Sequence, residues 1–312
     1  MESKTPTDLL QTVSRSFALC IPLLEKNKSG DVENMYLLSR VVDTIEDSSL
    51  GIEEKKCLMR EFFLTLKDES HIEGFVDLLR QGTIDAHDKV LSSRENYRTI
   101  LEGFNCLDEG VKRISISLLA EMSSGMIEFL GRGIETFDDL DEYCYYVAGT
   151  VGLYMNRIVA IKDGVMLDEQ KAISLGRYLQ KVNIIKNFAK DCTEGRHFWP
   201  TSLLRGKGDN MAALESMLRS AKSEAQNSFE YISSVPYRLA GYRKFLLLAG
   251  LMATENLRLM HENQEVFTNQ NGVKIPRNRM PEIFSMVEEA ACSNDALWKI
   301  KRELEGFVIT VN

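Results

Sequence analysis

The sequence predicts an all-α protein, and three observations carry this prediction. Strand-like alternation of apolar and polar residues is nearly absent along the 312 residues. Most of the six prolines lie between segments with helical periodicity. Several of these segments are apolar on more than one side, which is typical of helices in the middle of a bundle. No linker rich in Pro, Gly or Ser interrupts the chain, which favours a single domain over residues 1–312.

The apolar periodicity places the helices in order along the chain. They are expected over residues 7–26, 31–47, 52–66, 73–81, 94–106, 108–131, 137–163, 167–191, 210–234, 237–267 and 280–303. Asp31 and Asp138 stand where a carboxylate can cap a helix start, and Gly131 and Gly133 are expected to stop one long helix.

Composition excludes several classes of function. The net charge of −8 and the pI near 5.3 argue against a nucleic-acid partner. The four histidines and six cysteines form no zinc-ligand spacing, and the cysteines are expected to be reduced and mostly buried. No signal-peptide pattern is present, and the longest apolar run, residues 245–253, is half of what a membrane span needs. We expect a cytoplasmic protein that can contact a membrane peripherally.

An acidic stripe lies on the helix expected over residues 31–47. Asp43, Glu46 and Asp47 are spaced i, i+3 and i+4, so their carboxylates share one helix face. Arg40 and Tyr36 precede Asp43 on the same face. Carboxylates this close repel one another unless they face water, pair with bases or hold a divalent cation. Hard oxygen ligands suit Mg²⁺ with substrate phosphates completing the shell, although a solvated acidic face would show the same spacing.

A second polar face lies on the helix expected over residues 167–191. Its members recur at i, i+3, i+4, i+7 and i+8, namely Asn183, Lys186, Asn187, Lys190 and Asp191. Together with the nearby Arg196, these amides and bases suit a polyanion, and an amide with a carboxylate can still complete a Mg²⁺ shell. The alternative is an exposed face laced with ion pairs.

Two weaker signals accompany these faces. Ser14 and Arg15 begin the run Ser-Arg-Ser-Phe, where a guanidinium between hydroxyls can bind phosphate in a fork or form an ordinary salt bridge. Tyr146 precedes Gly149 and Gly152, and a glycine inside a helix costs about 0.5–1 kcal/mol relative to alanine. The glycines therefore indicate close helix packing, or room for a ligand beside a phenol that can donate a proton or hold a cation.

These features together favour a bundle with a central apolar cavity that binds an anionic head and a long apolar tail. The chemistry that fits is metal-assisted loss of diphosphate from an allylic substrate. Mg²⁺ and the bases would stabilise the leaving group, and the cavity would keep water from the carbocation.

Six motifs, in this order and spacing, resemble the squalene and phytoene synthase family. They are Ser-Arg-Ser-Phe at 14–17, Asp-Thr-Ile-Glu-Asp at 43–47, Met-Ile-Glu-Phe-Leu at 126–130, Tyr-Cys-Tyr-Tyr-Val-Ala-Gly at 143–149, Leu-Gln-Lys-Val-Asn-Ile-Ile at 179–185 and Gly-Arg-His-Phe-Trp-Pro at 195–200. The resemblance implies the all-α isoprenoid synthase fold. It also implies a Mg²⁺-dependent prenyltransferase that joins two farnesyl diphosphates head to head into presqualene diphosphate, which NADPH reduces to squalene.

The resemblance further implies roles for individual residues. The family's first aspartate-rich, Mg²⁺-binding motif is matched without change by Asp43, Glu46 and Asp47. Its diphosphate contacts are matched by Ser14, Arg15, Arg40 and Arg196. Tyr146 matches the tyrosine that serves the first half-reaction in proton removal and cation stabilisation, so Tyr146, Asp43 and Asp47 are the catalytic candidates.

The second aspartate-rich motif departs from the family pattern Asp-x-x-Glu-Asp. Its positions hold Asn187, Lys190 and Asp191, and Lys186 replaces a family arginine. The exchange is a local change of about +3 charges by reference pKa values. A charged ammonium has no lone pair for Mg²⁺. Lys186, Asn187 and Lys190 are therefore expected to contact diphosphate, with Asn187 and Asp191 as the remaining metal candidates.

The reductive step and the product stay open. Residues 245–253 lack the proline and glutamine that reducing squalene synthases often carry near NADPH, and the chain has no Gly-rich nucleotide fingerprint. Presqualene diphosphate, dehydrosqualene or another terpene are alternative products. A non-catalytic relative that binds isoprenoid diphosphates is the alternative function, although crowded carboxylates in an intact first motif favour the enzyme.

Overall fold

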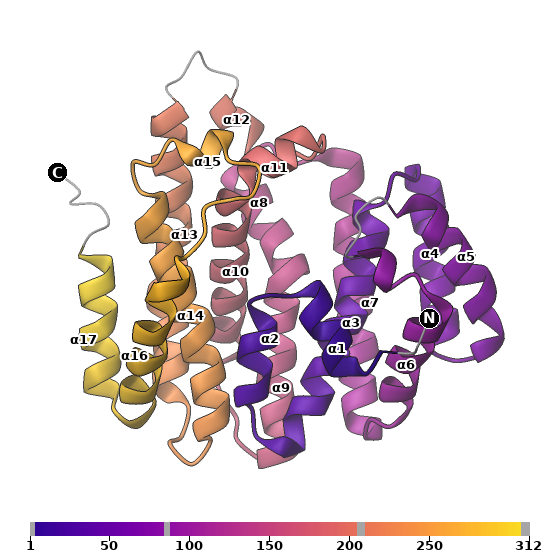
Figure 1. Ribbon diagram of the computed structural model, residues 1–312, viewed down its shortest axis with the longest axis horizontal. Helices are drawn as coiled ribbons and strands as arrows, with labels where there is room; N and C mark the ends of the chain where they lie inside the picture. Colours follow the sequence, from indigo (N-terminus) through magenta and orange to yellow (C-terminus); the bar gives the residue numbers. More distant parts are fainter. Residues whose placement is uncertain (1–3, 84–87, 205–209, 307–312) are drawn as a thin grey trace. The chain divides into compact units, whose positions relative to one another are not determined.

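The computed structural model describes residues 4–83, 88–204 and 210–306, and the regular secondary structure of these ranges is helical without strands (Figure 1). This confirms the predicted all-α class. The chain divides into two compact units, which are described one at a time. The first comprises residues 1–132 and 157–165, and the second comprises residues 133–156 and 166–312. The single domain expected from the sequence stays a prediction.

The first unit is built around α3, a helix with 11 buried residues. Its helices are α1 (Pro6–Val13), α2 (Phe17–Cys20), α3 (Lys26–Asp47), α4 (Ile52–Thr65), α5 (Ile72–Gly82), α6 (Arg94–Asn105), α7 (Glu109–Arg132) and the second half of α9 (Thr150–Asp163). Short 3-10 turns lie at Ile21–Leu23, Glu69–His71 and Asp88–Val90. Helices α1, α4, α6 and α7 pack against α3. Its apolar side is therefore fully enclosed, at Leu37, Leu38, Val41, Val42 and Ile45.

Ion pairs fix the start of α3 against the end of α9 within this unit. The fully buried ammonium of Lys28 lies 2.8 Å from Asp163, and Lys162 lies 2.9 Å from Asp31 and 2.6 Å from Asp108. Helix α3 begins at Lys26, so the prediction of Asp31 as its N-cap is wrong. Asp31 lies in the second turn of the helix instead, and its side chain pairs with Lys162.

The second unit is organised around α10 and α14. Its helices are the first half of α9 together with α8 (Phe137–Cys144), α10 (Glu169–Lys186), α11 (Phe188–Thr193), α12 (Thr201–Leu204), α13 (Asn210–Ser234), α14 (Ala240–Met260), α15 (Glu265–Thr268), α16 (Met280–Cys292) and α17 (Asn294–Glu305). A π-helical turn lies at Tyr145–Gly149 and a 3-10 turn at Arg277–Arg279. Helices α13 and α14 pack against α10, and α16 and α17 cover α14 (Figure 1).

A buried guanidinium holds the α13–α14–α16 corner of this unit. Arg243 of α14 is fully buried and donates to the backbone carbonyls of Ile232 at 2.7 Å and Ala290 at 3.2 Å, near the ends of α13 and α16. Burial lowers the pKa of Arg243 from its usual value. The charge is accommodated by carbonyl oxygens that the two helix ends would otherwise leave without partners.

The prediction of one continuous helix over residues 7–26 is wrong, because the segment is interrupted. Helix α1 ends at Val13, and Ser14 takes an extended backbone with φ −143° and ψ 133°. The Ser14 hydroxyl accepts a hydrogen bond from the Phe17 amide at 3.0 Å, which starts α2 after a turn. Side chains of this type compete with the helix for backbone donors, so the apolar periodicity runs across a break.

Four further helix boundaries differ from prediction. The segment 137–163 contains the π-helical turn, and 167–191 is divided at Asn187. Within 237–267, α14 ends at Met260, and within 280–303 the chain breaks at the extended residue Ser293, which caps α17. Thr136, not Asp138, caps α8, because its hydroxyl accepts from the Asp139 amide in a reciprocal capping box.

The structure also bears on the cysteines and on membrane-spanning helices, two features that were judged from composition. The six cysteines are free, but only Cys20 and Cys144 are buried, so the expectation that most are buried is wrong. Among the described helices, α7 is long and apolar enough to cross a membrane, and 44% of its most apolar stretch is buried inside the protein. Core helices of soluble proteins meet the same criterion, so this is weak evidence for a span. Residues 245–253 lie on α14 and are buried along their whole length.

Candidate active site

The acidic stripe predicted on α3 is present in the first unit. Asp43, Glu46 and Asp47 are half-buried on the side of α3 that its apolar face leaves accessible. Arg40 pairs with Asp43 at 2.9 Å, and these two side chains are 24% and 26% exposed. The period of the helix thus separates a fully enclosed apolar face from a polar face that a ligand can reach.

The segment that carries the predicted serine and arginine lies beside this stripe. The Phe17 ring of α2 contacts the Tyr36 ring of α3 with a centroid distance of 5.1 Å. Arg15 is exposed in the turn between α1 and α2. Because the Ser14 hydroxyl already accepts from the Phe17 amide, Arg15 is the better placed of the two predicted residues to contact an anion.

The donor chemistry of the stripe fits a magnesium ion. Three carboxylates on one accessible face provide the hard oxygen ligands that Mg²⁺ prefers, and they leave positions for phosphate and water. In the part of the chain that the structure describes, no three His, Cys, Asp or Glu side chains are gathered closely enough to hold a metal. The assignment of Asp43, Glu46 and Asp47 as ligands therefore stays a prediction.

In the second unit, Tyr146 lies on the π-helical turn between α8 and α9. Tyr146 is half-buried, its ring lies 5.4 Å from that of Tyr145, and its carbonyl accepts from the Thr150 hydroxyl at 2.8 Å. A π-turn inserts one residue into a helix, and such insertions are frequent at functional sites. The sequence placed Tyr146 correctly beside small residues but gave no sign of the inserted residue.

The glycines around this turn serve close packing against α10. A Cβ added at Gly152 would overlap the backbone carbonyl of Ala172, and one at Gly176 would overlap the carbonyl of Ala148. A Cβ at Gly149 would lie 2.9 Å from the Tyr145 ring. Of the two explanations that the sequence allowed, the structure supports helix packing. Helix α10 touches the π-turn and the start of α9 backbone to backbone.

The second polar face is divided by a break in the helix. Helix α10 ends at Lys186, and Asn187 has φ −99° and ψ 6° before α11 begins. Asn183 is exposed, Lys186, Asn187 and Lys190 are half-buried, and Asp191 is buried. The Asn187 amide donates to the Asn183 side-chain oxygen at 3.0 Å. The break changes the direction of the face but leaves its first four members accessible.

The carboxylate of this face is paired with the predicted arginine. Arg196 lies 2.9 Å from Asp191 and 2.5 Å from Glu194, and the Arg196 amide donates to the Asp191 carbonyl at 2.8 Å. Lys190 lies 3.7 Å from Glu194. The ion-pair explanation is therefore correct for the α11 end of the face. Asp191 is a weaker candidate for a metal ligand than Asp43, because both carboxylates pair with an arginine but the Asp191 side chain is 12% exposed and that of Asp43 is 26% exposed.

Two lysines near the break come together without a carboxylate. Burial lowers the pKa of Lys186, and the neighbouring charge of Lys274 lowers it further. Neither lysine forms a salt bridge within the described ranges. Gly272, with φ +69°, packs against the break, since a Cβ there would lie 2.9 Å from the Lys186 carbonyl and 3.0 Å from the Asn187 side-chain oxygen. Lys274 was missed from the sequence, where only the turn-forming Asn-Gly pair before it gave a signal.

Aromatic packing holds the α11 segment in place. The rings of Phe188 and Trp199 lie 4.3 Å apart, and Phe267 contacts both at 5.5 and 6.0 Å. A small pocket opens next to this cluster, and its lining includes Asp191, Arg196, His197 and Phe198. The side chains of the second face therefore project from a rigid base.

Comparison with known proteins establishes the family. The family model for squalene/phytoene synthase matches residues 10–279. The chain belongs to the squalene/phytoene synthase family. This confirms the resemblance inferred from the six motifs.

Relatives in this family cover most of the chain. Squalene synthase of Schizosaccharomyces pombe is 28% identical over 300 residues, which are 88% of this chain and 63% of that protein. The human squalene synthase is 28% identical over 296 residues, covering 88% and 67%, and squalene synthase 1 of Arabidopsis thaliana is 28% identical over 303 residues, covering 91% and 70%. The chain thus spans about two thirds of the length of these curated relatives.

Solved structures in the family have the same fold. A complex of TcSQS with the ligand BPH1237 has a TM-score of 0.84 and 26% identity, covering 98% of this chain and 92% of that chain. A dehydrosqualene synthase complex has a TM-score of 0.58 and 22% identity, covering 91% and 94%, and shows similarity of fold alone. These matches confirm the helical bundle expected for the squalene/phytoene synthase family.

Proposed function

We propose that this chain is a Mg²⁺-dependent prenyltransferase that condenses two farnesyl diphosphates head to head into presqualene diphosphate. The observation that carries the proposal is the stripe of Asp43, Glu46 and Asp47, with Arg40, on the accessible face of an otherwise enclosed helix. Crowded carboxylates are unfavourable without a cation. A family member that only bound its ligand through basic residues would have no need of them.

Roles for the stripe follow from its chemistry. Asp43, Glu46 and Asp47 would hold Mg²⁺, which when bound supplies positive charge to the leaving diphosphate. Arg40 now donates to Asp43, and it could donate to a phosphate oxygen instead, because a guanidinium forms charge-assisted hydrogen bonds with both carboxylates and phosphates. Arg15 contacts the same class of anion from the neighbouring turn.

Tyr146 is the proposed proton-transfer residue. Its phenol lies half-buried on a turn whose neighbours are apolar residues and glycines. A phenol in such surroundings can accept or donate a proton at its oxygen, and its ring face can stabilise a passing carbocation. The turn that carries this ring packs backbone to backbone against α10, where Gly176 approaches Ala148.

The second face acts on diphosphate directly rather than through a metal. Lys186 and Lys190 are ammonium groups, and the Asp191 carboxylate is engaged by Arg196. Only the Asn187 amide oxygen remains as a weak donor for Mg²⁺, so the residues present do not fit a metal site. Lys186, Asn187, Lys190 and Arg196 instead offer several donors to phosphate oxygens.

The reductive step is proposed as the variable part of the reaction. Residues 245–253 lie buried on α14, and they include neither of the two residues that reducing members often carry. Squalene made with NADPH is the first product to test, with presqualene diphosphate, dehydrosqualene or another terpene as the alternatives. Because such substrates and products are lipids, we infer a cytoplasmic enzyme that contacts a membrane surface peripherally.

A non-catalytic protein that binds isoprenoid diphosphates is the second candidate. The observation in its favour is the second motif, where Asn187 and Lys190 replace acidic residues. Such a protein would bind farnesyl diphosphate without releasing diphosphate. It would also tolerate loss of the carboxylates on α3.

Incubation of the purified protein with farnesyl diphosphate and Mg²⁺, with and without NADPH, separates these candidates. We expect Mg²⁺-dependent release of diphosphate, and the mass of the extracted product identifies the end point. Asp43→Asn is the matched control, because it keeps the side-chain size and removes the charge. Absence of diphosphate release under both conditions, with binding of farnesyl diphosphate retained, would establish the non-catalytic function.

A further inference from the structure

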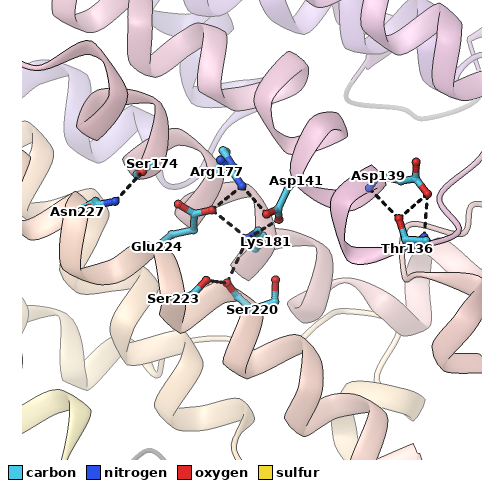
Figure 2. Close-up of polar contacts among 10 residues, drawn as sticks. All are labelled: Thr136, Asp139, Asp141, Ser174, Arg177, Lys181, Ser220, Ser223, Glu224 and Asn227. Atoms are coloured by element: carbon cyan, nitrogen blue, oxygen red, sulfur yellow. Dashed lines mark hydrogen bonds and ion pairs between the residues drawn. The ribbon is translucent and has the colours of Figure 1, made fainter.

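Four charged residues of the second unit form a closed network of ion pairs, drawn in Figure 2. Asp141 belongs to α8, Arg177 and Lys181 to α10, and Glu224 to α13. Asp141 lies 2.5 Å from Arg177 and 2.6 Å from Lys181. Glu224 binds the same two bases at 2.9 and 3.0 Å. Each base therefore bridges two carboxylates from different helices.

The network lies largely inside the protein and is neutral as a whole. The side chains of Lys181 and Glu224 are 1% and 8% exposed, while those of Arg177 and Asp141 are 24% and 35% exposed. Lys181 also donates to the Ser220 carbonyl at 3.2 Å, which completes its surroundings. An apolar replacement of similar volume would often pack at least as stably as such an ion-pair cluster. The specific contribution of the ion-pair network is to fix which residues of α8, α10 and α13 face one another.

Its place along the chain is what suggests a function. Asp141 precedes Tyr146 by five residues, so the ion pairs hold the last turn of α8 before the π-turn begins. Gly176 of α10 touches Ala148 within the turn, and Gly152 of α9, just after the turn, touches Ala172. Helix α10 therefore grips the chain on both sides of the inserted residue.

A π-turn is one extra residue in a helix, so shifting the insertion by one position would require local rearrangement of the backbone hydrogen bonds. Each such step would rotate the intervening side chains by about 100°, the angle between successive residues of a 3.6-residue turn. A fixed contact before the turn and a fixed contact after it prevent this movement. The direction of the Tyr146 phenol then depends on both contacts.

We propose that Asp141, with Arg177 and Lys181, positions Tyr146 by holding the start of the π-turn in register with α10. These three are positioning residues, since they act through the turn and not on a substrate. The expected effect on kcat rests on the proposed function of Tyr146. The expected effect on hydrogen exchange in the turn does not depend on that function. Glu224 provides the matched control, because it binds the same two bases from α13 and not from α8, the helix that leads into the turn.

Hydrogen exchange of the intact protein tests the structural part. Asp141→Asn and Glu224→Gln each remove one negative charge and keep the side-chain size. We expect Asp141→Asn to raise amide exchange in peptides spanning Tyr145–Gly149 by about tenfold or more, and Glu224→Gln to leave it within about twofold of the parent protein. Equal exchange in the two variants would overturn the proposal.

Steady-state diphosphate release from farnesyl diphosphate tests the kinetic part. We expect Asp141→Asn to lower kcat with little change in KM, and to add no further loss when combined with Tyr146→Phe. Additive losses in the double variant, or an equal fall in kcat for Glu224→Gln, would overturn the positioning role. If Tyr146→Phe alone is fully active, the proposed function of Tyr146 fails, and the exchange experiment still decides whether Asp141 holds the turn.

If the Asp141→Asn protein does not fold, Asp141→Glu can be used instead. This variant keeps both ion pairs and adds one methylene between α8 and α10. Positioning predicts a protein with nearly unchanged thermal stability but a several-fold lower kcat. A fully active Asp141→Glu variant, with unchanged exchange in the turn, would contradict the inference.

Discussion

Substitution of Gly176 by alanine tests whether backbone contact between α10 and the π-turn is required. The new Cβ would overlap the Ala148 carbonyl and would lie 2.9 Å from the Gly149 nitrogen. These are backbone atoms, so no side chain can rotate away to make room. The helices must separate by about 1 Å, since carbon and oxygen atoms without a hydrogen bond pack at more than 3 Å.

The expected magnitude is the difference between two effects. Alanine in place of glycine favours a helix by about 0.5–1 kcal/mol. Forcing an extra group into a packed contact costs about 1–3 kcal/mol, and the upper part of this range applies because the opposing atoms belong to the backbone. The net loss is therefore about 2 kcal/mol, or a fall in Tm of about 4 °C for a chain of this size.

Thermal unfolding monitored by circular dichroism measures this loss, with Gly131→Ala as the control. Gly131 also lies in a helix, α7, but a Cβ added there meets nothing within 4 Å. Gly131→Ala should leave Tm unchanged or raise it slightly. We also expect Gly176→Ala to lower kcat by moving Tyr146. A Gly176→Ala protein as stable as the Gly131→Ala protein would refute the packing argument.

Four further predictions concern separate parts of the molecule. Asp43→Asn should lower kcat for diphosphate release about 100-fold by removing a ligand charge, and near-normal turnover would remove Asp43 from the site. The pKa of Lys186 is lower in the folded protein than its ordinary value near 10.4, which applies to the unfolded chain. Between these two pKa values the unfolded chain binds more protons than the folded protein, so the free energy of unfolding should rise with pH in this window. Lys186→Met should abolish that rise in pH-dependent urea unfolding, stabilise the protein below the window, and weaken binding of inorganic diphosphate in calorimetry. Arg243→Met should cost about 3 kcal/mol in urea unfolding, because buried carbonyls of α13 and α16 lose their donor; a loss below about 1 kcal/mol would contradict this. Combining Asn187→Asp with Lys190→Glu should increase the number of Mg²⁺ ions bound, and an unchanged Mg²⁺ titration would show that this face cannot hold metal even with its carboxylates restored.

The acidic stripe of α3 could be predicted from the sequence, because in a regular helix the spacing of residues decides which face of the helix they lie on. Asp43, Glu46 and Asp47 had to share a face once the helix was correct, and the apolar residues between them had to be enclosed. The same reasoning failed at Ser14 and Ser293. There a hydroxyl offers the backbone another partner, and apolar periodicity does not record that competition.

The arrangement around Tyr146 was only partly accessible from the sequence. Gly149 and Gly152 indicated a close approach, but which backbone approached depended on Gly176 in a different helix. The network of Asp141, Lys181 and their partners depends on the packing of three helices, and no local pattern signals it. Lys274 was missed for the same reason, since its neighbour Lys186 is far away along the chain.

The charges of the two polar faces explain how a family member can lose its second acidic motif. The α3 stripe, with Arg40, carries a net charge of −2, so it can attract a diphosphate only after it has bound a divalent cation. The face with Lys186, Lys190 and Arg196 is cationic without any metal, and burial together with Lys274 makes the charged state of Lys186 costly. An anion at this face would relieve that cost, since a negative charge nearby favours the protonated ammonium. Under the proposed function, Asn187 and Lys190 would therefore make this face an anion site that needs no metal, and the expected dependence on Mg²⁺ would belong to α3.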